Sequence, residues 1–143
     1  MISLHTYEMD QILRNPLLLT TARHLTLGYG SGMNKALDKF QMQLDAGQSN
    51  NAKGIFAFKG EKAELAVGWC LLTQEGDGMD FCPKEGFSCV QIFVDAGHRR
   101  QGIGSIMLKE ASVLSVGRTI QCYQWGNPEF FNPFIKQGNF QSL

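Results

Sequence analysis

The 143-residue sequence lacks a long hydrophobic run and an excess of charge of one sign, and its first residues lack the pattern expected of a secretory signal. No apolar segment approaches the roughly 18 residues that a membrane-spanning helix needs. The first ten residues, MISLHTYEMD, contain neither a basic region nor a long apolar region. Lys plus Arg and Asp plus Glu number 13 each, so the formal net charge is zero. A general nucleic-acid binder would be basic, so we expect a cytoplasmic protein with no nucleic-acid and no membrane partner.

Paired metal-binding cysteines are also missing. Cys70, Cys82, Cys89 and Cys122 form no CxxC pair, and no histidine stands at zinc-finger spacing from them. Three of the four fall inside runs that resemble strands. We therefore expect buried cysteines in a reducing compartment, with no metal site and no cysteine nucleophile.

Glycine, by contrast, is abundant: the chain has 16, and most of them lie in short clusters that predict turns. Apolar residues make up 43% of the chain, which is enough for one sizeable core. No internal repeat, low-complexity tract or linker divides the sequence. We therefore expect a single domain over residues 1–143.

Hydrophobic periodicity predicts the order of the elements. Strands are expected at 2–7, 54–59, 63–73, 88–94 and 118–124, with a last short strand at 139–143. Helices are expected over 8–27, with a break near Asn15 before Pro16, and then over 33–47, 103–117 and 128–137. Hairpins come first and crossover helices later, which predicts an α/β (α+β) fold with a mixed sheet and helices on both faces.

The most informative segment, VQIFVDAGHRRQGIGSIML at 90–108, joins a strand to a helix. Arg99 and Arg100 precede Gly102 and Gly104, which open an amphipathic helix. The first N–H groups of a helix have no intrahelical partner and lie at the positive end of its dipole, and glycine lets a ligand approach the backbone. The segment therefore predicts a phosphate or pyrophosphate site. A Walker loop does not fit, because no Gly-Lys-Ser/Thr is present, and the dinucleotide fingerprint does not fit, because Met107 replaces its third glycine.

This segment resembles motif A of the GNAT superfamily, the acyl-CoA-dependent N-acyltransferases. The family pattern Q/R-x-x-G-x-G/A reads RRQGIG here, from Arg99 to Gly104, and the strand before it fits except for Ala96 at the usual proline. The predicted order of elements is similar to that family over nearly the whole chain. The resemblance implies a mixed, mostly antiparallel central sheet with helices on both faces, and a splay between two parallel central strands, 88–94 and 118–124.

The resemblance further implies that acetyl-CoA or coenzyme A is the cofactor. Its pyrophosphate would lie on the glycine turn and the first helical residues, and its pantetheine amides would pair with the strand backbone like an added half-strand. The residues implied for this contact are Ile92, Phe93, Val94, Arg99, Arg100, Gln101, Gly102, Ile103, Gly104, Ser105 and Asn127.

The C-terminal third departs from the family pattern N-x-x-A-x-x-L/F-Y-x-x-x-G-F. Asn127 and Gly138 fall in register, but Phe134 stands where many members carry the tyrosine that protonates the departing thiolate. A phenyl ring cannot donate a proton. The candidate substitutes are Tyr123, Cys122 and Asn132. A free thiol has a pKa of about 8.5, so the thiolate also leaves without much help at neutral pH.

The strand before the glycine turn carries no carboxylate, although some family members place a glutamate there. The expected function is transfer of an acetyl or acyl group to an unidentified small-molecule or protein amine by direct attack, with proton removal through water. The alternative is a non-catalytic protein of the same fold that binds coenzyme A or a protein partner, as a regulatory or phage-type accessory protein. Because the chain ends soon after Gly138, an open sheet edge is expected to favour a homodimer.

Overall fold

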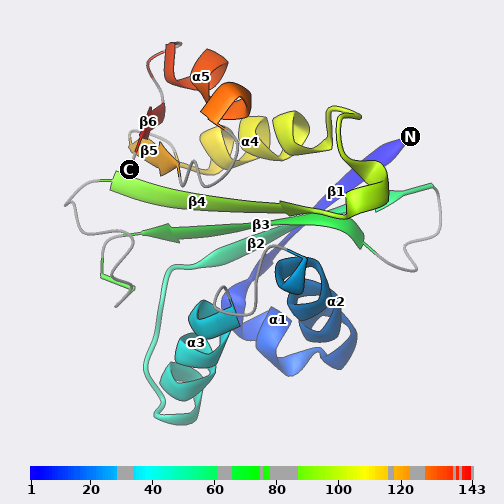
Figure 1. Cartoon of the computed structure of the whole chain (residues 1–143). Helices are drawn as coiled ribbons and strands as arrows, with labels where there is room; N and C mark the ends of the chain where they lie inside the picture. Colours follow the sequence, from blue (N-terminus) through cyan, green and yellow to red (C-terminus); the bar gives the residue numbers. More distant parts are fainter. Residues whose placement is uncertain are drawn as a thin grey trace.

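A mixed six-stranded sheet runs through the middle of the molecule (Figure 1). Its strands, in spatial and sequence order, are β1 (Ile2–Glu8), β2 (Lys53–Lys59), β3 (Ala66–Gln74), β4 (Phe87–Val94), β5 (Thr119–Cys122) and β6 (Phe140–Ser142). The first four are antiparallel, whereas β5 is parallel to β4 and β6 is parallel to β5. The computed structural model describes residues 1–28, 34–60, 66–74, 76–77, 87–115, 118–122, 128–136, 138 and 140–142.

Helices cover both faces of this sheet (Figure 1). One face carries α1 (Met9–Arg14), α2 (Pro16–Leu27) and α3 (Lys35–Asp45), and the other carries α4 (Ile103–Leu114) and α5 (Pro128–Lys136). A short 3-10 helix, η2 (Ala96–His98), lies between β4 and α4. The arrangement confirms the predicted mixed fold. In the part of the chain that is described, no helix is long and apolar enough to cross a membrane.

Pro16 and Pro133 stand at different places in their helices. Asn15 caps α2, because its side-chain oxygen accepts from the backbone N–H groups of Leu17 and Leu18 at 3.1 and 3.2 Å, and Pro16 begins the helix without needing a donor. The predicted break at Asn15 is therefore confirmed. Pro133 lies inside α5, which continues to Lys136, so the helix predicted over 128–137 is confirmed. Packing of its apolar face holds this short helix together.

The core between the sheet and α1–α3 is built on a row of aromatic rings. Phe56, Trp69 and Phe93, on β2, β3 and β4, stack with centroid separations of 5.7 and 5.6 Å and are almost completely buried. The indole N–H of Trp69 donates to the hydroxyl of Thr26 on α2 at 3.0 Å, and that hydroxyl donates to the carbonyl of Ala22 at 2.7 Å. This chain of hydrogen bonds fixes α2 over the centre of the sheet.

The second core lies between the sheet and α4 and α5, and it contains two of the cysteines. Cys70, Cys89 and Cys122 are free and fully buried, as expected. Burial raises the pKa of the Cys122 thiol to about 12 and raises the pKa of Cys70 further still. All three therefore serve as small packing side chains, and Cys122 holds its proton at neutral pH. Cys82 lies outside the described residues.

The parallel pair β4 and β5 positions the functional site. Pairing runs from Phe87 opposite Thr119 to Val90 opposite Cys122, and this confirms that the two strands are adjacent and parallel. Beyond Val90, β4 continues to Val94 paired with β3, well past the end of β5 in Figure 1. The continuation of β5 to residue 124, expected from the sequence, falls outside the described residues.

Strands β1 and β6 form the edges of the described sheet, and a homodimer through an open edge stays a prediction.

Replacing Thr26 by valine keeps the shape of the side chain but removes the acceptor of the Trp69 N–H. The buried donor is then left without its partner, so we expect the free energy of unfolding to fall by about 1–3 kcal/mol. Thr20→Val, at an exposed position on the same helix, should change it by less than about 0.5 kcal/mol. Urea unfolding of the two variants measures the difference, and equal stabilities would contradict the role given to Thr26.

Candidate functional site

The turn after β4 is fixed by hydrogen bonds that begin at Asp95. Its backbone N–H donates to the carbonyl of Val67 on β3 at 2.8 Å, and its own carbonyl accepts from the N–H of His98 at 2.9 Å. Its carboxylate lies 2.8 Å from Nδ1 of His98, and this hydrogen bond is the main reason that the pKa of Asp95 is lowered. The start of the turn is thus anchored both to the sheet and to η2.

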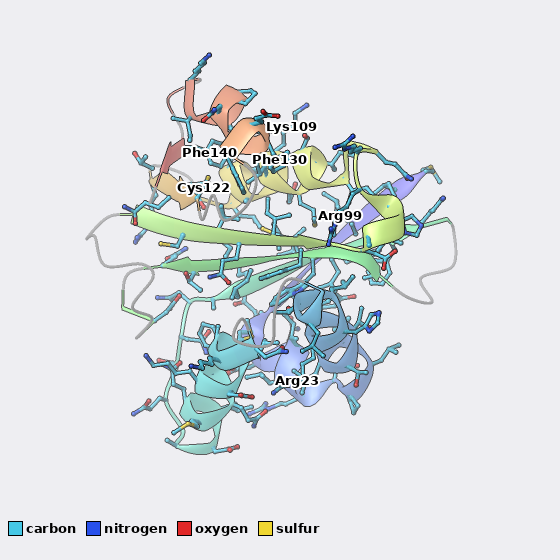
Figure 2. All side chains as sticks on the ribbon, in the orientation of Figure 1. Arg23, Arg99, Lys109, Cys122, Phe130 and Phe140 are labelled. Atoms are coloured by element: carbon cyan, nitrogen blue, oxygen red, sulfur yellow. The ribbon has the colours of Figure 1, made fainter. Side chains whose placement is uncertain are left out.

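Two residues of the turn adopt left-handed backbone conformations. Arg100 has φ 63° and Gly102 has φ 80°. Glycine adopts this conformation at no steric cost, whereas a residue with a side chain does so only where its surroundings demand it. Arg99 supplies part of that demand: its Nε donates to the carbonyl of Val94 at 3.2 Å (Figure 2). Its Nη2 lies 4.0 Å from where a Cβ would stand at Gly28, the residue that ends α2.

The first turn of α4 presents backbone donors that the protein does not cap. Gly102 is the N-cap residue and has no side chain to accept from them, and the first helical turn carries no acidic residue. The first intrahelical bond is the one from the N–H of Ile106 to the carbonyl of Gly102 at 3.1 Å. The N–H groups of Ile103, Gly104 and Ser105 therefore have no partner within the helix. Arg100 and the residues up to Gly102 are exposed beside them, so the end of the helix fits an anion of the size of a pyrophosphate.

Along β4, the backbone N–H and C=O groups of successive residues point alternately toward β3 and toward the side of β5. Because the N–H of Asp95 points to β3, the antiparallel pattern directs the N–H and C=O groups of Phe93 to β3 as well, opposite Trp69. The backbone groups of Ile92 and Val94 point away from β3, to the side beyond the described end of β5. Of the three strand residues expected to contact pantetheine, only Ile92 and Val94 thus offer backbone groups on that side, and the carbonyl of Val94 already accepts from Arg99.

Helix α5 packs a phenyl ring directly on the start of α4. A Cβ placed on Gly104 would stand 2.8 Å from Cζ of Phe130, so only glycine fits under the ring as it lies. The sequence predicted Gly104 for its closeness to a ligand and missed this contact. Phe130 stands three residues after Asn127, where the family pattern has alanine, and that departure was the available signal.

The positions that the sequence suggested for catalysis are not shown in contact with this turn. Asn132 is exposed on α5, and Phe134 is half-buried, with its ring 5.8 Å from that of Phe130 and 5.6 Å from that of Phe140 on β6. Phe134 therefore helps to pack α5 against the edge of the sheet. Tyr123 and Asn127 lie outside the described residues, and their roles stay predictions.

The match to a family model is the finding that classifies the chain. Residues 22–127 match the model of the acetyltransferase (GNAT) family, and the protein belongs to this family. A comparison with curated proteins gives no match.

Solved structures of GNAT proteins share the fold. A GNAT-family protein of Desulfovibrio desulfuricans superposes with a TM-score of 0.60 at 16% identity, covering 96% of this chain and 81% of that chain. An acetyltransferase of Trypanosoma brucei gives 0.57 at 14% identity, covering 99% and 94%. The aminoglycoside 6′-N-acetyltransferase of Acinetobacter haemolyticus gives 0.59 at 12% identity, covering 97% and 90%. At these identities the likeness concerns the fold alone.

The contact between Gly104 and Phe130 makes the two positions energetically coupled. Gly104→Ala should lower the melting temperature, because the new methyl group displaces the ring. In a Phe130→Ala background the same change should cost less, by at least about 0.5 kcal/mol in a double-mutant cycle. Thermal and urea unfolding of the four proteins measure the coupling, with Ser112→Ala on the same helix as a control. Strictly additive effects would show that the ring does not rest on Gly104.

Proposed function

We propose that the protein transfers an acetyl or other short acyl group from its coenzyme A thioester to an amine. The observation that carries this proposal is the uncapped N-terminus of α4, which follows a left-handed Gly102 at the end of the turn between β4 and α4 in a chain of the GNAT family. Acetyl-CoA, when bound, supplies an activated acyl group, and the transfer exchanges its carbon–sulfur bond for a carbon–nitrogen bond while the amine proton ends on the thiol.

The residues around the turn would have different roles in binding the cofactor. The N–H groups of Ile103, Gly104 and Ser105 would hold the pyrophosphate, with the exposed Arg100 adding positive charge. The N–H of Val94 points away from β3 and would donate to a carbonyl oxygen of a ligand lying along this edge of β4, which favours negative charge on that oxygen. Asp95 and Arg99 act on the backbone instead, since their hydrogen bonds hold the turn in place.

Acetyl-CoA should bind to the purified protein with a measurable heat. At a concentration of about 100 times its Kd it should stabilise the protein by about 2.7 kcal/mol. Gly102→Val should abolish binding, because a branched side chain is strained at φ 80° and covers the backbone donors, and Arg100→Ala should weaken it. Lys109→Ala, at an exposed position further along α4, should leave the Kd unchanged. Calorimetry and thermal shift with millimolar acetyl-CoA measure these effects, and the absence of both heat and shift would refute the cofactor.

A non-catalytic protein that binds coenzyme A is the second candidate. The observation that favours it is the ring of Phe130 over Gly104, which brings bulk next to the anion site where the family pattern has a small residue. The contacts of Phe134 with Phe130 and Phe140 also favour this candidate, because the ring at the position of the family's tyrosine packs against other side chains. Turnover with a panel of amines distinguishes the two candidates.

Restoring a hydroxyl with Phe134→Tyr should leave turnover unchanged, because the ring packs between α5 and β6. A general acid is worth about 10²–10⁴-fold where proton transfer limits the rate. A rise of that order would therefore place the hydroxyl at the reacting atoms and contradict the packing role. Phe134→Leu keeps the apolar character without the ring and controls for changes in stability. Initial rates for the three proteins at saturating acetyl-CoA supply the comparison.

A further inference from the structure

The first strand, β1, pairs on one side only. It is an edge of the described sheet, next to β2 (Figure 1). The N–H of Gly60 donates to the carbonyl of Met1 at 3.0 Å, so the backbone of Met1 points to β2. In an antiparallel pair this direction alternates along the strand, so the N–H and C=O groups of Ile2, Leu4 and Thr6 point out of the sheet. Within the described part of the chain, these groups form no hydrogen bond.

The sequence of β1 does not protect this edge. Natural sheets discourage pairing at an exposed edge with charged side chains, proline, bulges or very short edge strands. From Ile2 to Tyr7 the strand contains no Lys, Arg, Asp, Glu or Pro. Its register runs without a shift from Ile2 opposite Lys59 to Glu8 opposite Lys53, so no bulge bends it away. It is also seven residues long, whereas β6 at the other edge has three. Such an edge indicates a surface that pairs with another strand.

The outward backbone groups of β1 match a second copy of the same strand. Two copies can lie antiparallel about a two-fold axis that passes beside Leu4. Leu4 then stands opposite the Leu4 of the other copy, and Ile2 stands opposite its Thr6. Each of these positions is a hydrogen-bonded pair, so every outward N–H and C=O group of the three residues in both copies gains a partner.

The side chains agree with the same register. Ile2 and Leu4 are half-buried and pack against the core under α4 and α5, so the two leucines at the axis extend that apolar face from one copy to the other. On the other face, Ser3 stands opposite His5, and a hydroxyl and an imidazole can form a hydrogen bond. No two like charges face each other, and the formal net charge of zero keeps the repulsion between two copies small.

We propose that the protein forms a symmetric dimer through β1, with the two strands antiparallel and centred on Leu4, so that the sheets of two copies join into one. The occupant of the edge is thus a second copy of this chain. Because β2 and β3 separate β1 from β4, the turn before α4 lies outside this interface in both copies. The dimer is therefore independent of the proposed acyl transfer.

Thr6→Pro tests the dimer with little effect on the fold of one copy. Thr6 is exposed, and its N–H points away from β2, so proline removes only an outward donor. The dimer has two copies of this position and loses two hydrogen bonds, so its dissociation constant should rise at least tenfold. Thr6→Val keeps the N–H and should leave the dissociation constant unchanged.

Sedimentation velocity between micromolar and millimolar concentrations measures the association of the three full-length proteins. Urea unfolding shows whether the variants keep the fold. We expect the wild type and Thr6→Val to be dimers at the higher concentrations, and Thr6→Pro to be a folded monomer. A monomeric wild type, oligomers larger than two, or a dimer that Thr6→Pro leaves intact would overturn the proposal.

A disulfide cross-link tests the register independently. The two Leu4 Cα atoms would be about 5.5 Å apart, so Leu4→Cys should give a covalent dimer under mild oxidation. Thr6→Cys is the matched control on the same face, because its counterpart lies four residues away along the paired strands, about 13 Å. The natural cysteines are the same in both variants. Electrophoresis without reductant measures the product, and equal cross-linking of both variants, or of neither, would contradict the axis at Leu4.

Discussion

The reversal of the chain between β4 and α4 is the constraint on which the rest of the site depends. Asp95 ties the start of the turn to β3, and Arg99 ties its end back to Val94. The helix can then lie close to the sheet because β3 has a glycine beneath it. A Cβ on Gly68 would stand 3.1 Å from Cε of Met107 on α4. The distance between α4 and the sheet, and with it the position of the first N–H groups of α4, thus depends on a glycine that is far from the turn in the sequence and beside it in the structure.

Features that depend on a few adjacent residues were predictable from the sequence. Asn15 before Pro16 predicts a helix boundary by local hydrogen bonding alone, and Gly102 predicts the left-handed start of α4. Pro133 removes a backbone donor inside α5, yet the helix predicted over 128–137 forms. The apolar face of α5 packs against the sheet, and this tertiary term outweighs the lost hydrogen bond.

Features that depend on which surfaces meet were not predictable. Nothing in the neighbourhood of Gly104 indicates that a ring from α5 will lie on it. Likewise, Gln91 reads in the sequence as one polar residue in a strand. Only the register of three strands places it near Gln121 and Thr73. The anion site was therefore predictable in outline, and the chemistry around it was visible only in three dimensions.

The buried cysteines have a consequence for the chemistry that the protein tolerates. Peroxides and electrophiles attack the thiolate far more readily than the thiol. With a pKa of about 12, Cys122 is almost never a thiolate at physiological pH, and Cys70 is equally protonated and has no exposed surface. The central strands are therefore insulated from oxidative damage at these two positions. The sheet that supports the site should keep its shape under conditions that inactivate enzymes with exposed, acidic thiols.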